Sequence, residues 1–173
     1  MDFNYIATTH RYREEDLVDE LQTLFSDNGD IYATAYASNI DGLVTGTIND
    51  SLNFVNFLRQ KLKDAPWEIR YLLRFIPIEK VANTNMSEIK DISIELAKKI
   101  PIDTTFKIFI EKRHTNLNKL DIINNIAPFI SQKVDLTEPN WIILIEIIGK
   151  YSGISVIKND VIFSSMIEKR YFE

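Results

Sequence analysis

The stretch Trp141–Ile148, WIILIEII, decides which fold the second half of the chain adopts. It is apolar at nearly every position, and Glu146 is its one charged residue. Continuous apolar character predicts a strand buried on both faces, because a strand with one wet face alternates between apolar and polar residues. We therefore predict that these residues form the central strand of a sheet.

Two segments upstream of this run have the lengths of a parallel strand–helix–strand unit. A strand is predicted at Thr104–Glu111 and a helix at Asn118–Gln132. Parallel neighbours need a crossover of about a dozen residues or more, which this helix supplies. Pro128 lacks a backbone donor inside the helix, so we expect a kink or an early end near Ala127.

The rest of the second half begins at a polar stretch, Val81–Asn85, which we interpret as the joint between two domains, residues 1–80 and 81–173. Asn85 is predicted to cap a helix, with Glu88 three residues later as its partner. The further elements predicted here are a helix at Ile89–Ile100, which Pro101 ends, a turn at Gly149–Gly153, and strands at Ile154–Lys158 and Val161–Ile167.

The first half has the element order β-α-β-β-α-β. Strand patterns and helical apolar stripes alternate along it, and Asp41-Gly42 predicts a hairpin between the second and third strands. This order is typical of a ferredoxin-like module, in which two helices cover one face of an antiparallel sheet, and it makes the fold class α+β. The predicted strands are Phe3–Thr9, Ile31–Ala37, Leu43–Ile48 and Glu68–Pro77, and the predicted helices are Arg13–Ser26 and a segment from Ser51 to the residues before Pro66.

Composition and charge exclude several classes of function. The chain has no cysteine, which excludes disulfides, thiolate metal ligands and a cysteine nucleophile. No apolar run reaches the roughly 20 residues of a membrane span, and no signal peptide is recognisable, so we expect a cytoplasmic protein. The net charge of −5 comes from residues 1–80, which carry 8 Lys and Arg residues and 13 Asp and Glu residues. Residues 81–173 carry 12 basic and 12 acidic residues and are neutral overall. A nucleic-acid surface is therefore expected in the second half.

The sequence contains no local signature of a catalytic site. His10 and His114 are the only histidines, and the spacing of Gly42 and Gly46 fits neither a phosphate-binding loop nor a dinucleotide fingerprint. The acidic stretch that starts at Glu14 is interpreted as the solvated face of a helix rather than as a metal site. Tyr5, Tyr32, Tyr36 and Tyr71 are expected in the core rather than as stacking platforms, although single-stranded RNA uses such platforms.

Several local matches, taken in order, resemble a THUMP domain over Phe106–Ile157, and in particular the adaptor subfamily that works with a tRNA acetyltransferase. The ferredoxin-like half resembles the domain that commonly precedes THUMP. The matching motifs are Phe109–Arg113, Asn125–Ala127, Val134–Leu136 with Pro139, Glu146–Ile148 and Gly153–Val156, with Arg74–Ile78 upstream.

The resemblance implies a tRNA-binding protein without catalytic activity and without a cofactor. It implies recognition of the tRNA acceptor stem and 3′ end, and presentation of the tRNA to a separate enzyme that forms N4-acetylcytidine. Two alternatives stay open: an RNA-binding subunit of a tRNA methyltransferase or thiolation enzyme, and a ligand-sensing ferredoxin-like module without an RNA role.

The candidate RNA contacts are basic residues near strand and helix ends. The predicted βα turn could reach phosphates, although a solvated loop has the same composition. Arg113 is also implied by the resemblance, whereas Lys98 and Lys99 could equally favour a helix dipole. Of the two arginines that alternate along the predicted strand Glu68–Pro77, Arg70 is expected to be structural and Arg74 to contact RNA. The complete set of candidates is Arg74, Lys98, Lys99, Lys107, Lys112, Arg113, His114 and Lys119.

Overall fold

The computed structural model describes residues 1–172, which form two compact units, each with its own sheet. The N-terminal unit comprises Asp2–Pro77 together with the chain from Asp160 on, and the central unit comprises Ile78–Asn159. The α+β class predicted from the sequence is confirmed. No helix in the described part of the chain is long and apolar enough to cross a membrane.

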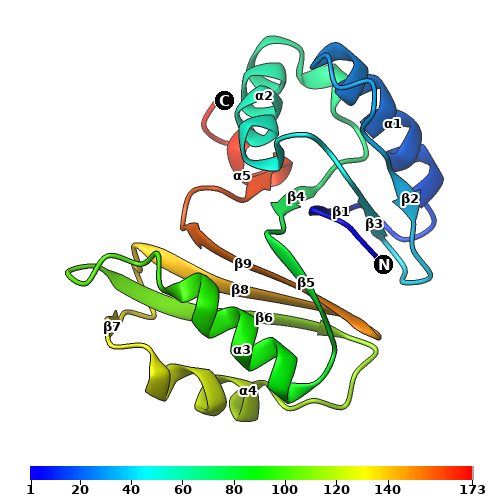
Figure 1. The fold of residues 1–173 in the computed structure, drawn as a ribbon. Helices are drawn as coiled ribbons and strands as arrows, with labels where there is room; N and C mark the ends of the chain where they lie inside the picture. Colours follow the sequence, from blue (N-terminus) through cyan, green and yellow to red (C-terminus); the bar gives the residue numbers. More distant parts are fainter. Residues whose placement is uncertain (173) are drawn as a thin grey trace. The chain divides into compact units, whose positions relative to one another are not determined.

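The N-terminal unit has the predicted element order and a five-stranded sheet in the order β10-β4-β1-β3-β2, with every pair antiparallel. Figure 1 shows α1 and α2 on one face of this sheet, as a ferredoxin-like module requires. Its elements are β1 (Tyr5–Thr8), α1 (Glu14–Asp27), β2 (Tyr36–Ala37), β3 (Leu43–Gly46), α2 (Ser51–Asp64), the 3-10 helix η1 (Pro66–Glu68), β4 (Arg74–Pro77), β10 (Phe163–Ser164) and α5 (Ser165–Lys169).

An aromatic cluster forms the core between this sheet and its helices. Tyr5 is fully buried and stacks on Phe75 with 4.7 Å between the ring centroids, while Phe25 and Phe54 come from the two helices. The Tyr5 hydroxyl donates a hydrogen bond of 2.6 Å to the carbonyl of Thr34. Burial raises the pKa of Tyr5, so this hydroxyl stays a donor at neutral pH.

Gly46 lies where the backbone of β3 passes very close to Thr34. A Cβ at this position would stand 1.9 Å from the Thr34 carbonyl oxygen and 2.6 Å from the Tyr5 hydroxyl oxygen. Glycine is therefore required by close approach, and its neighbours at this point belong to the backbone or to the buried core.

The predicted strand Glu68–Pro77 is shorter than expected, because Glu20 captures part of its backbone. The Glu20 carboxylate accepts the N–H groups of Arg70, Tyr71 and Leu72, at distances of 2.8 to 3.2 Å. These donors are consequently lost to a ladder, and β4 begins only at Arg74. The predicted strand Ile31–Ala37 likewise shrinks to the two residues of β2.

The predicted domain division needs correction at both ends of the second half. Val81–Asn85 is no joint, because Lys80–Asn83 forms β5 and pairs with β9 of the central sheet. The predicted strand Val161–Ile167 is replaced by β10 and α5, and Phe163 pairs with Phe75 of the N-terminal sheet. Phe163 is fully buried in the aromatic core, which explains why the chain returns to this unit.

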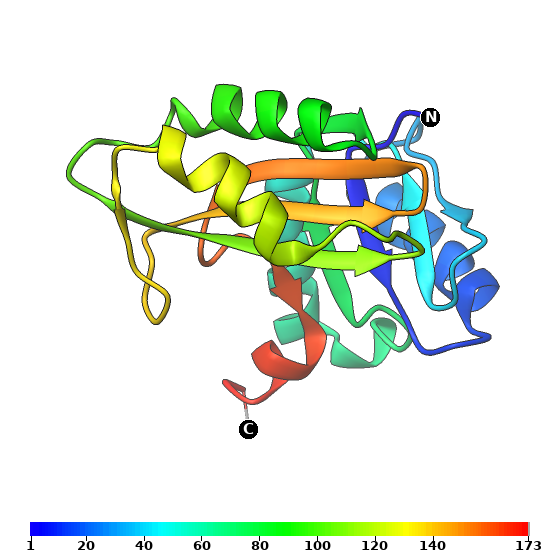
Figure 2. The ribbon, with the colours of Figure 1, turned by 90° about the horizontal axis from the view of Figure 1, so that it is seen from below.

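The central unit has a five-stranded sheet in the order β5-β9-β8-β6-β7. Strands β6 and β8 are parallel, and Figure 2 shows α3 and α4 on one face of the sheet, so the predicted βαβ crossover is confirmed. The elements are β5 (Lys80–Asn83), α3 (Met86–Ala97), β6 (Thr105–Arg113), α4 (Lys119–Ile126), the 3-10 helix η2 (Ala127–Phe129), β7 (Lys133–Val134), β8 (Trp141–Ile148) and β9 (Tyr151–Lys158).

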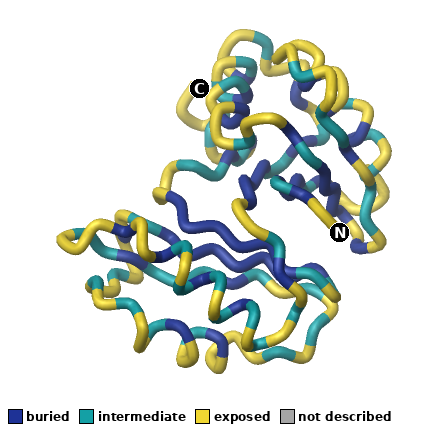
Figure 3. Tube along the Cα trace, viewed as in Figure 1, coloured by how far each residue is buried: buried dark blue, intermediate teal, exposed yellow. Residues whose placement is uncertain are grey.

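Two local predictions in this unit are confirmed. The WIILIEII run forms β8 at the middle of the sheet, and seven of its eight residues are buried. Figure 3 shows the buried strands of this sheet as a dark tube. Helix α4 ends at Ile126, and the chain continues as the 3-10 turn that contains Pro128. The missing proline N–H thus ends the helix near Ala127, as expected.

The start of α3 is held by the predicted pair of polar side chains. Asn85 accepts the backbone N–H of Glu88 at 2.9 Å, and the Glu88 carboxylate accepts the side-chain amide and the backbone N–H of Asn83 at 3.1 and 2.8 Å. The side-chain bond from Asn83 is the largest cause that lowers the pKa of Glu88 below its ordinary value, followed by the Asn83 backbone bond. The ionised form of Glu88 therefore stabilises this corner of the fold.

We expect Glu88→Gln to lower the melting temperature at pH 7 and to have little effect in acid. Because the folded-state pKa lies below the unfolded-state value, the contribution of Glu88 is present above the unfolded-state pKa and is lost as the pH falls through the folded-state pKa. Thermal unfolding of the variant and the wild type from pH 7 to pH 3 measures the difference. Asp91→Asn, which removes one exposed charge from the same helix, is the control. A difference that stays constant down to pH 3 contradicts the assignment.

Candidate nucleic-acid interface

The β6–α4 turn, taken together with the end of β6 and the first residue of α4, holds four of the candidate residues, Lys112, Arg113, His114 and Lys119. Lys112 is exposed and donates from Nζ to the Leu117 carbonyl at 2.9 Å, which bridges the turn. His114 is exposed and has a φ of 54°, in the left-handed region that L-residues rarely adopt. The turn is therefore a defined structure rather than an unstructured loop.

The start of α4 adds a further basic side chain to this turn. The Asn118 side chain accepts the N–H groups of Leu120 and Asp121 at 2.8 and 3.2 Å, and this cap fixes where the helix begins. Lys119 is the first residue of the helix and is exposed. Lys112, His114 and Lys119 can thus present cationic or hydrogen-bonding groups to solvent from one turn.

Arg113 is held differently from its neighbours. Its Nη1 lies 2.7 Å from Oε2 of Glu146, the charged residue of the central strand, and the Glu146 side chain is fully buried. The side chain of Arg113 is only 20% exposed. The structure therefore gives Arg113 a role in the fold of the turn, and its binding to RNA remains a prediction.

The other candidates of the central unit lie at the opposite end of β6. Lys98 and Lys99 follow α3, and Lys107 is the third residue of β6. Since β6 has nine residues, its two ends are separated by about 25 Å, at roughly 3.3 Å per residue. The predicted residues consequently form two groups rather than one.

In this second group, some of the lysines already interact with other side chains of the protein. Lys99 forms an ion pair with Glu79, and Glu79 also accepts the N–H of Val156 at 2.7 Å. Nζ of Lys107 lies 6.0 Å from the ring centroid of Phe109. Lys98 is exposed at the C-cap of α3, where its charge also favours the helix dipole.

Strand pairing adds two lysines that the sequence analysis missed. Lys133 pairs with Thr105 at the start of β6, and Lys158 pairs with Trp141, with its Nζ 5.9 Å from the indole ring. Both side chains belong to exposed residues. Their proximity to the start of β6 depends on the register of three strand pairs, β7–β6, β6–β8 and β8–β9, for which the sequence carries no local signal.

The candidate arginines of the N-terminal unit occupy different settings. Arg74 is half-buried at the start of β4 and pairs with Thr8 on one side and Ser164 on the other. Arg70 donates from Nε to the carbonyl of Trp67 at 3.0 Å, in agreement with the structural role expected for it.

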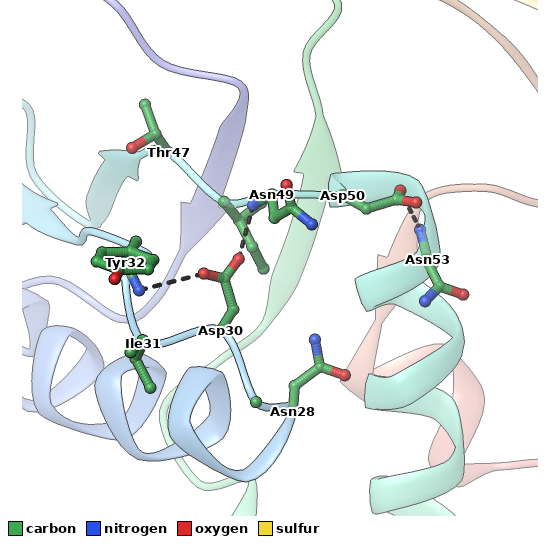
Figure 4. A pocket seen from close by; sticks show the side chains of 10 residues that line it. Asn28, Asp30, Ile31, Tyr32, Thr47, Asn49, Asp50 and Asn53 are labelled. Carbon is green, nitrogen blue, oxygen red and sulfur yellow. Dashed lines mark hydrogen bonds between the residues drawn. The ribbon is translucent and has the colours of Figure 1, made fainter.

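The tyrosine prediction is correct for Tyr5 and wrong for two others. Tyr32 is 86% exposed and Tyr36 is 64% exposed, because the segment that carries them is mostly not a strand. Tyr32 borders an open hollow of about 770 Å³ at the start of α2, shown in Figure 4. The hollow contains the carboxylates of Asp30 and Asp50, which accept backbone N–H groups of Asn49 and Asn53 at 2.7 and 2.9 Å. These acidic groups make it unsuited to phosphate.

Within residues 1–172, no group of three or more His, Cys, Asp or Glu side chains is arranged to hold a metal ion. The central unit instead presents exposed basic side chains at the ends of strands and helices, and such side chains can bind phosphate groups.

Comparison with known proteins finds similarity in the central part of the chain. Residues 83–157 match the model of the THUMP domain. Over 117 residues the chain is 27% identical to THUMP domain-containing protein 1 of Mus musculus and 26% identical to that of Homo sapiens. Each match covers 62% of this chain, and the chain spans about a third of the length of these relatives.

Solved structures share the fold at low sequence identity. The crystal structure of PH1313 from Pyrococcus horikoshii superimposes with a TM-score of 0.71 at 14% identity, over 91% of this chain and 55% of that chain. A 4-thiouridine synthetase in complex with RNA and ATP gives 0.60 at 16% identity, over 94% and 42%. TrmN from Thermus thermophilus gives 0.59 at 14% identity, over 90% and 45%.

Proposed function

We propose, on the premise that residues 83–157 form a THUMP domain homologous to that of THUMP domain-containing protein 1, that this chain is a tRNA-binding protein of tRNA modification. The family match is the observation that carries the proposal. The exposed cations of the β6–α4 turn support it, because phosphate contacts from Lys and from defined turns supply much of the affinity for nucleic acids.

In its sharper form, the chain is an adaptor that recognises the acceptor stem and 3′ end and presents the tRNA to a separate N4-acetylcytidine-forming acetyltransferase. It contributes position rather than chemistry: binding both tRNA and enzyme raises the effective concentration of a cytidine at the active site. The sequence supports this form through the adaptor-like motifs and through the lack of a local catalytic signature.

Two measurements test these statements separately. Binding of the purified chain to an intact tRNA transcript, and to the same transcript trimmed of its single-stranded 3′ end, tests the recognition. Acetylation of tRNA by the purified acetyltransferase with and without the chain tests the adaptor role. Equal acetylation without the chain removes the adaptor role and leaves RNA binding standing.

A second candidate keeps the RNA and changes the chemistry. The fold is shared with solved structures named as a 4-thiouridine synthetase bound to RNA and as TrmN, and one further neighbour is named as a putative methyltransferase. On this candidate the chain is the RNA-binding subunit of a thiolation enzyme or methyltransferase. Purification of the tagged chain from its own cells, followed by identification of the enzyme that accompanies it, separates the two candidates.

We expect Lys119→Gln to weaken tRNA binding without changing stability. Lys119 is exposed at the first position of α4, so the substitution removes one cation that binds phosphate and should reduce the slope of log K against log salt by about 1. Fluorescence anisotropy with labelled tRNA at several salt concentrations measures the slope. Lys63→Gln, at an exposed position near the end of α2, is the matched control and should leave the slope unchanged.

A further inference from the structure

The segment His10–Arg13 of the N-terminal unit joins β1 to α1 and has the sequence HRYR. All four residues are exposed, and Tyr12 is 83% exposed. His10, Arg11 and Arg13, three residues that can carry positive charge, therefore flank Tyr12 in the sequence, in a unit whose overall charge is negative. Basic side chains interleaved with an aromatic ring are the composition that single-stranded nucleic acids bind.

The backbone of this turn is fixed in a conformation that its sequence does not favour. Tyr12 has a φ of 67°, in the left-handed region, which is unfavourable for an L-residue with a Cβ. Its N–H donates to Oε1 of Glu14 at 3.3 Å, and the N–H of Arg13 donates to the His10 carbonyl at 3.1 Å. The ring is thus displayed by a defined turn, and strain of this kind gathers at functional positions.

Gly42, in the hairpin between β2 and β3, holds the turn through hydrogen bonds of its backbone. Oε1 of Glu14 also accepts the N–H of Gly42, and Thr9 donates its N–H to the Gly42 carbonyl at 2.9 Å. Gly42 has a φ of 74°, and a Cβ there would stand 2.7 Å from the Thr9 carbonyl oxygen. The hairpin between β2 and β3 therefore holds the base of the turn, so little ordering is left to occur on binding.

The two arginines are paired in a way that a phosphate can replace. Nε of Arg11 lies 3.1 Å from Asp41, and Nη1 of Arg13 lies 3.0 Å from Asp16. Both arginine side chains are more than half exposed, at 67% and 58%. Exposed ion pairs contribute little to stability, and a guanidinium can bind a phosphate through two hydrogen bonds.

The same design occurs in the central unit. Among residues 1–172, Tyr12 and His114 are the non-glycine residues with positive φ. Each lies in the turn that leads from a strand to a helix, one after β1 and the other after β6, and each follows an arginine. A basic βα turn with an exposed ring at a left-handed position is thus present in each unit.

We infer that the turn His10–Arg13 is a second RNA-binding site, in which the Tyr12 ring stacks on an unpaired base while Arg11 and Arg13 bind the flanking phosphates. This inference rests on the proposed function as an RNA-binding protein and adds the N-terminal unit to its RNA-binding surface. Stacking on an aromatic ring tolerates any base, so the turn contributes affinity for an unpaired segment rather than sequence specificity.

Tyr32 provides a matched control for Tyr12. The two tyrosines are almost equally exposed, at 86% and 83%. Tyr32 borders a hollow with the carboxylates of Asp30 and Asp50, whereas Tyr12 lies between two arginines. A general effect of removing a surface tyrosine appears in both glycine variants, whereas RNA stacking disappears only when the aromatic ring at position 12 is removed.

The test measures tRNA binding of the full chain carrying Tyr12→Gly, Tyr12→Phe, Tyr32→Gly or Arg11→Ala with Arg13→Ala. Glycine accepts the left-handed conformation, so Tyr12→Gly keeps the fold and its melting temperature stays at or above that of the wild type. We expect Tyr12→Gly to weaken binding by about 5- to 100-fold with an unchanged salt slope, because stacking releases no counterions. Tyr12→Phe and Tyr32→Gly should bind as the wild type does.

The double arginine variant should instead reduce the salt slope, by about 1 for each phosphate that is no longer neutralised. If the wild type binds tRNA and Lys119→Gln weakens it while Tyr12→Gly binds normally, the inference is overturned and the proposed function stands. If the wild type does not bind tRNA at low salt, both are overturned.

Discussion

Replacing Arg113 with Ala is expected to destabilise the central unit by about 3 kcal/mol, because the change removes the cation from a carboxylate buried in the middle of a sheet. Lys112→Ala, one residue earlier and exposed, should cost much less. Arg113→Lys should fall between them, since an ammonium keeps the charge and loses the planar geometry of the guanidinium.

The two tryptophans of the chain allow this effect to be assigned to a unit. Trp141 lies in β8 of the central unit and Trp67 lies in η1 of the N-terminal unit. Urea unfolding followed by fluorescence in a Trp67→Phe background reports the central unit, and the Arg113→Ala transition should shift there to lower urea. A midpoint equal to that of Lys112→Ala would show that the ion pair contributes little.

The buried ion pair also affects which residues can test RNA binding. Weaker tRNA binding by Arg113→Ala can follow from disruption of the turn and does not by itself show that Arg113 binds a phosphate. The exposed residues Lys119 and Tyr12 are better probes, because their side chains can be removed while the fold is kept.

Gly46→Ala is expected to destabilise the N-terminal unit by about 3 kcal/mol or more, at the upper end of what overpacking costs. The new methyl group meets the Thr34 carbonyl and the Tyr5 hydroxyl, so either β3 moves or the hydrogen bond between those groups breaks. Neither neighbour can turn away, because one is backbone and the other is a fully buried ring.

Gly153→Ala is the matched control for this strand glycine. The Cβ added there meets three side-chain carbons of Ile78, at 2.9 to 3.1 Å, and no backbone atom is among its three nearest neighbours. A side chain can shift by a few tenths of an ångström, so we expect a smaller loss of stability. Unfolding followed by Trp67 fluorescence in a Trp141→Phe background measures the Gly46 effect, and Trp141 fluorescence in a Trp67→Phe background measures the Gly153 effect in the central unit. Equal losses for the two variants contradict the explanation.

The parts of the fold that could be predicted from the sequence are those with a strong local period. The apolar run of β8 and the helical stripe of Leu17, Leu21 and Leu24 carry their own evidence, and Pro128 ends its helix by removing a donor. The predicted order β-α-β-β-α-β followed from these elements and their turns.

The wrong predictions share a different cause, which is a partner distant in the sequence. Residues 70–72 have the alternation of a strand, yet Glu20, some fifty positions earlier, takes their N–H groups. Phe163 follows the central strands in the sequence but fills the aromatic core of the other unit. Local patterns cannot indicate which of two partners a segment chooses.

The candidate site also contains parts that could be predicted from local sequence patterns and parts that depend on distant partners. The βα turn from Lys112 to Lys119 could be predicted, because a strand end followed by a helix cap places those residues together. The pairing of Arg113 with Glu146 spans 33 positions and could not, and neither could the approach of Lys133 and Lys158 to the start of β6. The left-handed Tyr12 carries no signal in sequence, because glycine or asparagine is the usual residue there.

The return of the chain to β4 through β10 makes the central unit an insertion within the N-terminal unit. During synthesis, residues 78–159 leave the ribosome before Phe163 does. The aromatic core of the N-terminal unit therefore cannot be completed until Phe163 has been synthesised. The central unit can therefore fold while its host is still incomplete, and cutting the gene after residue 80 yields a host without that ring. An isolated N-terminal unit is better made by joining Pro77 to Asp160 through a short linker.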